Sequence, residues 1–141
     1  MTTSAADYVP PMLHEQVGFL LRQFTSDTPG VAHAIVVSVD GLVLAYTESM
    51  APEQAERVAA IVAGLGSLAD GASKELGGGP VETSVVGMTL GNLLVLTASN
   101  GARLAVLSSV EQDIGHVSYC MQLFVDQVGE VALKAEARHG L

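Results

Sequence analysis

The chain alternates between two spacings of apolar residues. Three long segments repeat apolar residues every three or four positions, which is typical of one face of an α-helix. Shorter runs between them are rich in β-branched residues, which are typical of strands. This order predicts a helix, two strands, a long helix, three strands and a final helix. The expected bounds are 12–25 for the first helix, 52–76 for the long helix, and 31–39, 42–47, 81–89, 93–99 and 103–108 for the strands.

Glycine-bearing pairs separate consecutive strands, and each suits a two-residue turn. The pairs are Asp40-Gly41, Gly91-Asn92 and Asn100-Gly101. Asp-Gly and Asn-Gly favour a type I′ turn, in which both central residues take positive φ, whereas Gly-Asn favours a type II′ turn. The turns therefore predict one hairpin and, after the long helix, a three-stranded meander.

Proline, glycine and capping residues predict where the helices begin and end. Pro52 fits the first turn of the long helix, because its missing N–H is not needed there. Three glycines at 77–79 followed by Pro80 would end this helix, since glycine accepts a left-handed cap and proline cannot continue the helix. Ser109 and Gln112 have the spacing of a capping box, and we expect them to open the last helix.

The long helix carries two stripes. The first is apolar and is expected to cover the sheet; it comprises Val58, Ile61, Val62, Leu65, Leu68, Ala69, Ala72 and Leu76. The second is small and comprises Ala60, Gly64, Ser67 and Gly71. Each interior glycine costs about 1 kcal/mol relative to alanine, and small side chains let another backbone approach closely. The small stripe thus predicts either contact with a second copy in a dimer or tight packing within one chain, and we favour the dimer.

The composition of the 141-residue chain favours a single domain that has a partner. Hydrophobic residues make up 49% and charged residues only 15%, against about 25% in typical soluble domains. Part of the apolar surface is therefore expected to be covered by another molecule. We expect a flexible tail over 1–10, the domain over 11–133 and a C-terminal tail over 134–141.

Charge and targeting signals disfavour several classes of function. A net charge of −9 repels nucleic acid and anionic lipid. The sequence lacks an apolar run of about 18 residues that would cross a membrane, and residues 1–11 lack the basic and apolar regions of a signal peptide. The single cysteine, Cys120, has no partner for an internal disulfide. These features favour a cytoplasmic protein.

Motifs for catalysis or cofactor binding are missing from the sequence. Gly66 and Gly71 have the glycine spacing of a phosphate-binding loop, but Ala72 stands where the loop needs lysine. Cys120 shares a helix face with His116, although its apolar neighbours favour a small core side chain. The four histidines are widely separated and form no metal-binding motif. We therefore expect no enzyme activity, no metal and no cofactor.

Several segments together resemble a known family. They are 28–34 (TPGVAHA), 39–42 (VDGL), 59–69 (AAIVAGLGSLA), 104–107 (LAVL) and 113–121 (DIGHVSYCM). Over residues 20–131 the chain resembles the roadblock, dynein light-chain-like domain, most of all the bacterial branch found in actinobacterial conservon gene clusters. This resemblance implies an α+β fold: a five-stranded antiparallel sheet in the order α-β-β-α-β-β-β-α, with the long helix on one face and the terminal helices on the other.

The resemblance also implies a function, that of a non-catalytic homodimeric adaptor or regulator of a Ras-like small GTPase in a bacterial signalling complex. Such domains dimerise through strand three and the long helix. The dimer contacts would then be Ala60, Gly64, Ser67, Gly71, Val81, Thr83, Val85 and Gly87, and the GTPase-facing residues Glu53, Glu56, Arg57 and Lys74. Other proteins of the complex would also bind, and any association with a membrane would be made through partners.

Two further readings stay open at this point. Arg57 or Arg103 could act as an arginine finger on a bound GTPase, although a surface charge is the commoner explanation for both. A ligand-sensing PAS-like or GAF-like domain is the alternative function, because antiparallel sheets flanked by helices also build such pockets. A small molecule bound to the purified protein would favour that alternative.

Overall fold

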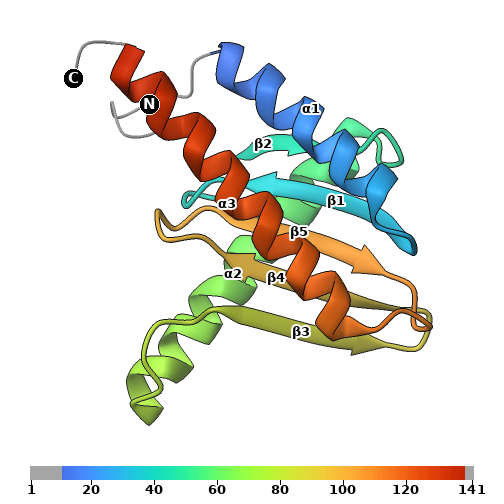
Figure 1. Cartoon of the computed structure of the whole chain (residues 1–141). Helices are drawn as coiled ribbons and strands as arrows, with labels where there is room; N and C mark the ends of the chain where they lie inside the picture. Colours follow the sequence, from blue (N-terminus) through green and yellow to red (C-terminus); the bar gives the residue numbers. More distant parts are fainter. Residues whose placement is uncertain (1–10, 139–141) are drawn as a thin grey trace.

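A computed structural model of the chain describes residues 11–138. It has the predicted order of three helices and five strands, with each element close to its expected bounds (Figure 1). The helices are α1 (Pro11–Asp27), α2 (Pro52–Leu76) and α3 (Ile114–Arg138). The strands are β1 (Val31–Val37), β2 (Val43–Tyr46), β3 (Thr83–Met88), β4 (Gly91–Thr97) and β5 (Arg103–Ser108).

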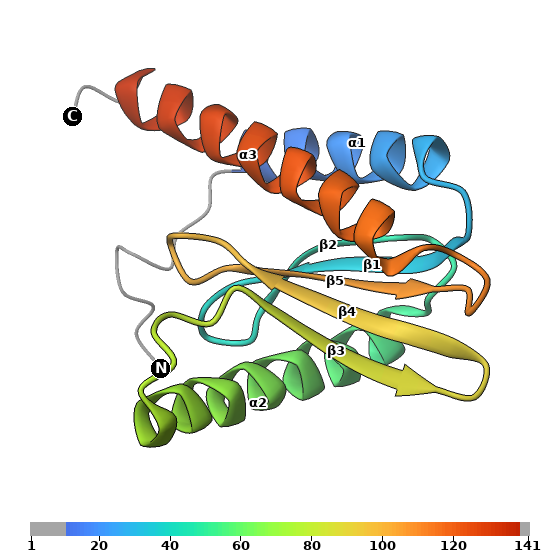
Figure 2. The ribbon, with the colours of Figure 1, turned by 60° about the horizontal axis from the view of Figure 1, so that its bottom comes forward.

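The strands form one antiparallel sheet in the order β2-β1-β5-β4-β3, so β2 and β3 are its edges. Helices α1 and α3 cover one face and α2 crosses the other, as Figure 2 shows. This three-layer arrangement confirms the predicted fold. Because side chains alternate along a strand, the sheet contributes to a separate hydrophobic core on each face.

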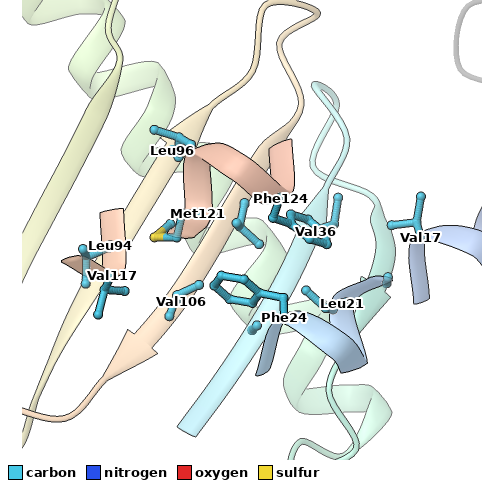
Figure 3. Close-up of a cluster of buried hydrophobic side chains, with 13 residues drawn as sticks. Val17, Leu21, Phe24, Val36, Leu94, Leu96, Val106, Val117, Met121 and Phe124 are labelled. Carbon is cyan, nitrogen blue, oxygen red and sulfur yellow. The ribbon is translucent and has the colours of Figure 1, made fainter. Parts of the chain in front are cut away.

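The larger core lies beneath α1 and α3 (Figure 3). Leu21 and Phe24 of α1 meet Met121 and Phe124 of α3 above the inner strands, and all four side chains are buried. Helix α1 packs on the sheet through this apolar stripe, and Nδ1 of His14 lies 3.2 Å from the carbonyl oxygen of Leu44 in β2. The core on this face therefore joins the two ends of the domain.

The smaller core lies beneath α2 and corrects part of the face that we predicted for this helix, since Val62 and Val58 of that face do pack in or against this core. The buried residues of α2 are the small Ala55, Ala59 and Gly66 together with Val62. Of the predicted apolar face, Ile61, Leu68 and Leu76 are exposed by 57%, 75% and 83%. Small residues bring the helix close to the sheet, and its largest apolar side chains consequently point away from the core.

The two turns that we predicted as type I′, at Asp40-Gly41 and Asn100-Gly101, have a different geometry. At the β1–β2 connection the N–H of Gly41 donates to the carbonyl of Ser38, and the N–H of Ser38 donates to the carbonyl of Leu42. Equivalent bonds link residues 98, 101 and 102 at the β4–β5 connection. Only glycine has a positive φ among residues 11–138, with φ of 84° at Gly41 and 89° at Gly101. Both connections are thus three-residue loops that end in a glycine bulge.

The third turn lies two residues earlier than predicted. Met88 pairs with Gly91 across the β3–β4 hairpin, so the two-residue turn is Thr89-Leu90, and Gly91 does not have the positive φ that type II′ requires. Gly91 instead begins β4, where a Cβ would lie only 3.2 Å from the carbonyl oxygen of Ser108. Glycine is needed here for close approach to β5 rather than for a turn.

The structure confirms the end of α2 and corrects the start of α3. Gly77 takes the left-handed cap with φ of 64°. The first turn of α3 is capped by Asp113, whose Oδ1 accepts from the N–H of Gly115, whereas Ser109 lies in the preceding turn. Helix α3 continues to Arg138, so 134–138 of the expected C-terminal tail are helical. The expected tail over 1–10 lies outside the described residues.

Candidate functional site: the free side of α2 and the edge strand β3

The second half of α2 is largely exposed among the described residues. Gly66 is the last buried residue of this helix, all of which is described. We call the ten residues that follow it, 67–76, the overhang. Figure 1 shows the end of α2 extending past the start of β3. A hollow of about 660 Å³ lies between the overhang and the segment that leads into β3, and its lining includes Ala72, Leu76 and Glu82.

The small stripe predicted on α2 is exposed along its whole length. Ala60, Gly64, Ser67 and Gly71 are all exposed, and a Cβ built on Gly64 or Gly71 meets nothing within 4 Å. Tight packing within the same chain, the alternative explanation of these glycines, is therefore wrong for the described residues. The role of the stripe in a dimer stays a prediction.

The strand residues predicted for the dimer do not share a face with this stripe. Thr83 and Val85 lie opposite Leu96 and Leu94, which belong to the core beneath α1 and α3. Directly opposed residues point to the same face, so the side chains of Thr83 and Val85 point away from α2. Gly87 lies two residues further along the strand and so occupies the same face. Val81 precedes the strand. What lies near α2 is the other face of β3, with Ser84, Val86 and Met88.

The edge of β3 is itself open. The strand pairs with β4 on one side, and no described strand pairs with its other side. Its six residues include no proline and its register shows no bulge. Val85 is 48% exposed and Met88 47%. Such an edge presents a row of backbone donors and acceptors to a second strand.

The four predicted GTPase-facing residues are exposed but form two separate groups. Glu53, Glu56 and Arg57 lie in the first turns of α2, whereas Lys74 lies in the last. At 1.5 Å per residue, Lys74 is about 25 Å along the helix from Arg57. Glu56 also lines a hollow of about 440 Å³, together with His14 of α1 and residues of β2. Any surface that uses all four residues must span the length of the helix.

Arg103 is buried, which corrects its expected role as a surface charge or an arginine finger. Its exposed fraction is 7%, and it points to the α2 side of the sheet because its pairing partner Val37 belongs to the core beneath α2. Its Nη2 lies 3.5 Å from Oδ2 of Asp70. A side chain held between helix and sheet cannot reach a nucleotide on another protein. The sequence signal for this arrangement was Gly66, whose lack of a side chain makes room for the guanidinium.

The remaining candidates for chemistry are the histidine, cysteine and carboxylate side chains. Within residues 11–138, no three His, Cys, Asp or Glu side chains lie where they could hold a metal ion. Cys120 packs partly buried against the larger core, with its Sγ 3.7 Å from Nε2 of His116. In the part of the chain that the structure describes, no helix is sufficiently long and apolar to cross a membrane.

Comparisons with known proteins agree with the fold. A family model of the Roadblock/LC7 domain matches residues 19–108. The roadblock/LC7 domain from Streptomyces avermitilis is 32% identical, with a TM-score of 0.77, over 82% of this chain and 97% of that one. Myxococcus xanthus MglB is 12% identical, with a TM-score of 0.80, over 90% and 95% of the two chains. A structure of MglB with a tetrameric arrangement is 21% identical, with a TM-score of 0.78, over the same shares. No match was found among curated proteins.

Proposed function

The chain belongs to the Roadblock/LC7 domain family, and from this membership we propose that it is a non-catalytic, homodimeric adaptor or regulator of a Ras-like small GTPase in a bacterial signalling complex. The proposal includes a cytoplasmic location, with other proteins of the complex as further partners. The family resemblance supports the GTPase as partner, and the free side of α2 carries the rest of the argument.

Self-association is supported by two unpartnered features on one side of the molecule. The open edge of β3 offers backbone hydrogen bonds to a second strand, and the overhang beside it exposes Leu68 and Leu76. Two copies that meet through the same surface form a closed pair, which is the commonest symmetry of soluble oligomers. A structure of an MglB with a tetrameric arrangement supports self-association within this fold.

The GTPase is proposed to bind across the two α2 helices of the dimer. Glu53, Glu56 and Arg57 carry exposed charges at one end of this helix and Lys74 at the other. A pair of such helices would present a broad charged platform. Charges at the rim of an interface mainly tune the association rate and the choice of partner.

Co-purification from the native host tests the proposal. The tagged protein is immobilised, and host small GTPases loaded with GDP or with GTP are passed over it. We expect at least one GTPase to be retained in one nucleotide state, and sedimentation to give the mass of a dimer. Retention of no GTPase in either state contradicts the assignment. A small molecule that co-purifies in either hollow would favour the ligand-sensing alternative.

A further inference from the structure

We propose that Arg103 fixes the direction in which the overhang leaves the sheet, and that it thereby positions the surface for self-association. The second part rests on the proposed dimer, whereas the first part stands on the isolated chain. Arg103 is a positioning residue in this proposal, because it is buried beneath α2 and would act through the helix.

The first observation is the contact between Arg103 and Gly66. A Cβ added to Gly66 would overlap Cζ, Nε and Nη2 of Arg103, so the guanidinium lies directly against the backbone of α2. Gly66 is also the last residue of α2 that is buried. The contact therefore lies where the helix leaves the sheet.

The second observation is that little else supports the helix beyond this point. The ion pair between Arg103 and Asp70 reaches one turn further along α2. Beyond it lies the hollow of about 660 Å³ between the overhang and the segment leading into β3. Among the described residues that face this hollow, Ser73 bonds through its hydroxyl to the carbonyl of Gly79, which ties the helix end to its own return loop rather than to the sheet. The orientation of the overhang thus depends on the contacts of Arg103 with Gly66 and Asp70, where the overhang begins.

The third observation is that Arg103 is a poor choice for stability alone. Its Nε is buried and has no hydrogen-bond partner among residues 11–138, and Asp70, its only ionic partner there, is 51% exposed. Burying a charged group with incomplete pairing is costly, and an apolar residue of similar volume is often as stable or more stable. Buried ionic groups of this kind can instead specify one arrangement of the packed elements.

Hydrogen exchange of the variant Arg103→Met tests the first part of the proposal on dilute, monomeric protein. This substitution leaves the sequence and intrinsic helicity of α2 unchanged. We expect the amides of 67–76 to exchange about tenfold faster, which is the middle of the range of coupling energies for residues in one contact network. The amides of β1 and β5 should keep their protection. Arg22→Met on α1 is the control, because it removes the same charge from an exposed site.

Gly66→Ala is an independent variant, for which the proposal and helix propensity predict opposite changes in the exchange rate of the overhang. Alanine favours the helix, so propensity alone would slow exchange in the overhang. Gly64→Ala is the control and should show this slowing, because a Cβ at Gly64 meets nothing within 4 Å. Displacement of the guanidinium should make exchange faster. If Arg103→Met and Gly66→Ala both leave exchange of 67–76 at or below the wild-type rate, the proposal is overturned.

The link to self-association is measured separately by analytical ultracentrifugation. We expect Arg103→Met to raise the dimer dissociation constant about tenfold, and Arg22→Met to leave it unchanged. An unchanged constant in folded Arg103→Met overturns the second part. A wild-type protein that stays monomeric would contradict the proposed function, and the exchange experiment would still decide the role of Arg103 at the root of the overhang.

Discussion

Phe24 of α1 and Phe124 of α3 meet with ring centroids 5.5 Å apart and ring planes inclined by 50°. Tilted aromatic pairs of this kind contribute beyond the area that they bury. The two rings come from opposite ends of the sequence, so their contact closes the layer above the sheet (Figure 3). Loss of either ring should therefore loosen α1 and α3 together.

Phe24→Ala should lower the free energy of unfolding by about 3–5 kcal/mol, because it removes a buried ring and leaves a cavity between the helices. Urea denaturation followed by circular dichroism measures the change. Phe19→Ala on the same helix is the control: Phe19 is 53% exposed, and its loss should change stability by no more than about 0.5 kcal/mol. Equal effects of the two substitutions would contradict the assignment of the core.

Leu68→Lys should weaken self-association, because it places a charge on the apolar part of the overhang that two copies are proposed to bury. Gly64→Leu should do the same by holding the two helices apart. Light scattering at tens of micromolar, which corresponds to about 6–7 kcal/mol of association, separates dimer from monomer. The control is Leu123→Lys on α3, which lies on the opposite face of the sheet. A dimer that tolerates both α2 variants does not use this surface.

The double reversal Glu56→Lys with Arg57→Glu should weaken binding of the GTPase without dissolving the dimer, because exposed charges at an interface rim act mainly on association and selectivity. Binding is measured against each retained host GTPase, and the mass of the variant by light scattering. Glu15→Lys with Arg22→Glu on α1 makes the same neutral exchange of charge elsewhere. If the α2 reversal and this control bind every GTPase equally well, the proposed surface is wrong.

Asp113→Ala should destabilise the domain by about 1 kcal/mol, because it removes the side-chain acceptor that caps the first turn of α3. Ser109→Ala should have an effect of no more than about 0.5 kcal/mol, because Ser109 lies before the helix. Chemical denaturation of both variants compares the observed cap with the one that the sequence pattern favoured. A larger loss for Ser109→Ala would reverse the assignment.

The order of the elements could be predicted from sequence because each signal was local. Apolar spacing identified the helices, β-branched runs identified the strands, and the glycines at 77–79 ended α2 where expected. The hairpin geometry was harder to predict. An Asp-Gly or Asn-Gly pair supplies a positive φ at its glycine in both a two-residue turn and a three-residue loop, and the choice depends on pairing between distant strands.

The face of α2 could be predicted only in part, as at Val58 and Val62, because the rule that large apolar residues point inward ignores what lies beneath the helix. The sheet places Arg103 under Gly66, so the helix meets it with small residues and turns Leu68 outward. For the same reason the burial of Arg103 was missed: an arginine at the start of a strand carries no local sign of its partner. The contact joins residues far apart in the sequence and belongs to tertiary packing.

The strand order also bears on the colloidal behaviour of the protein. β2 has only four residues and an irregular register with β1, whereas the six residues of β3 offer a regular edge. A regular open edge can pair with a strand of any neighbouring chain. When two different edges pair, the contact does not form a closed dimer, and further chains can add to the assembly. A folded variant that cannot form the proposed dimer should therefore precipitate when it is concentrated. Its yield of soluble protein would indicate that the edge of β3 is exposed, before any binding assay is made.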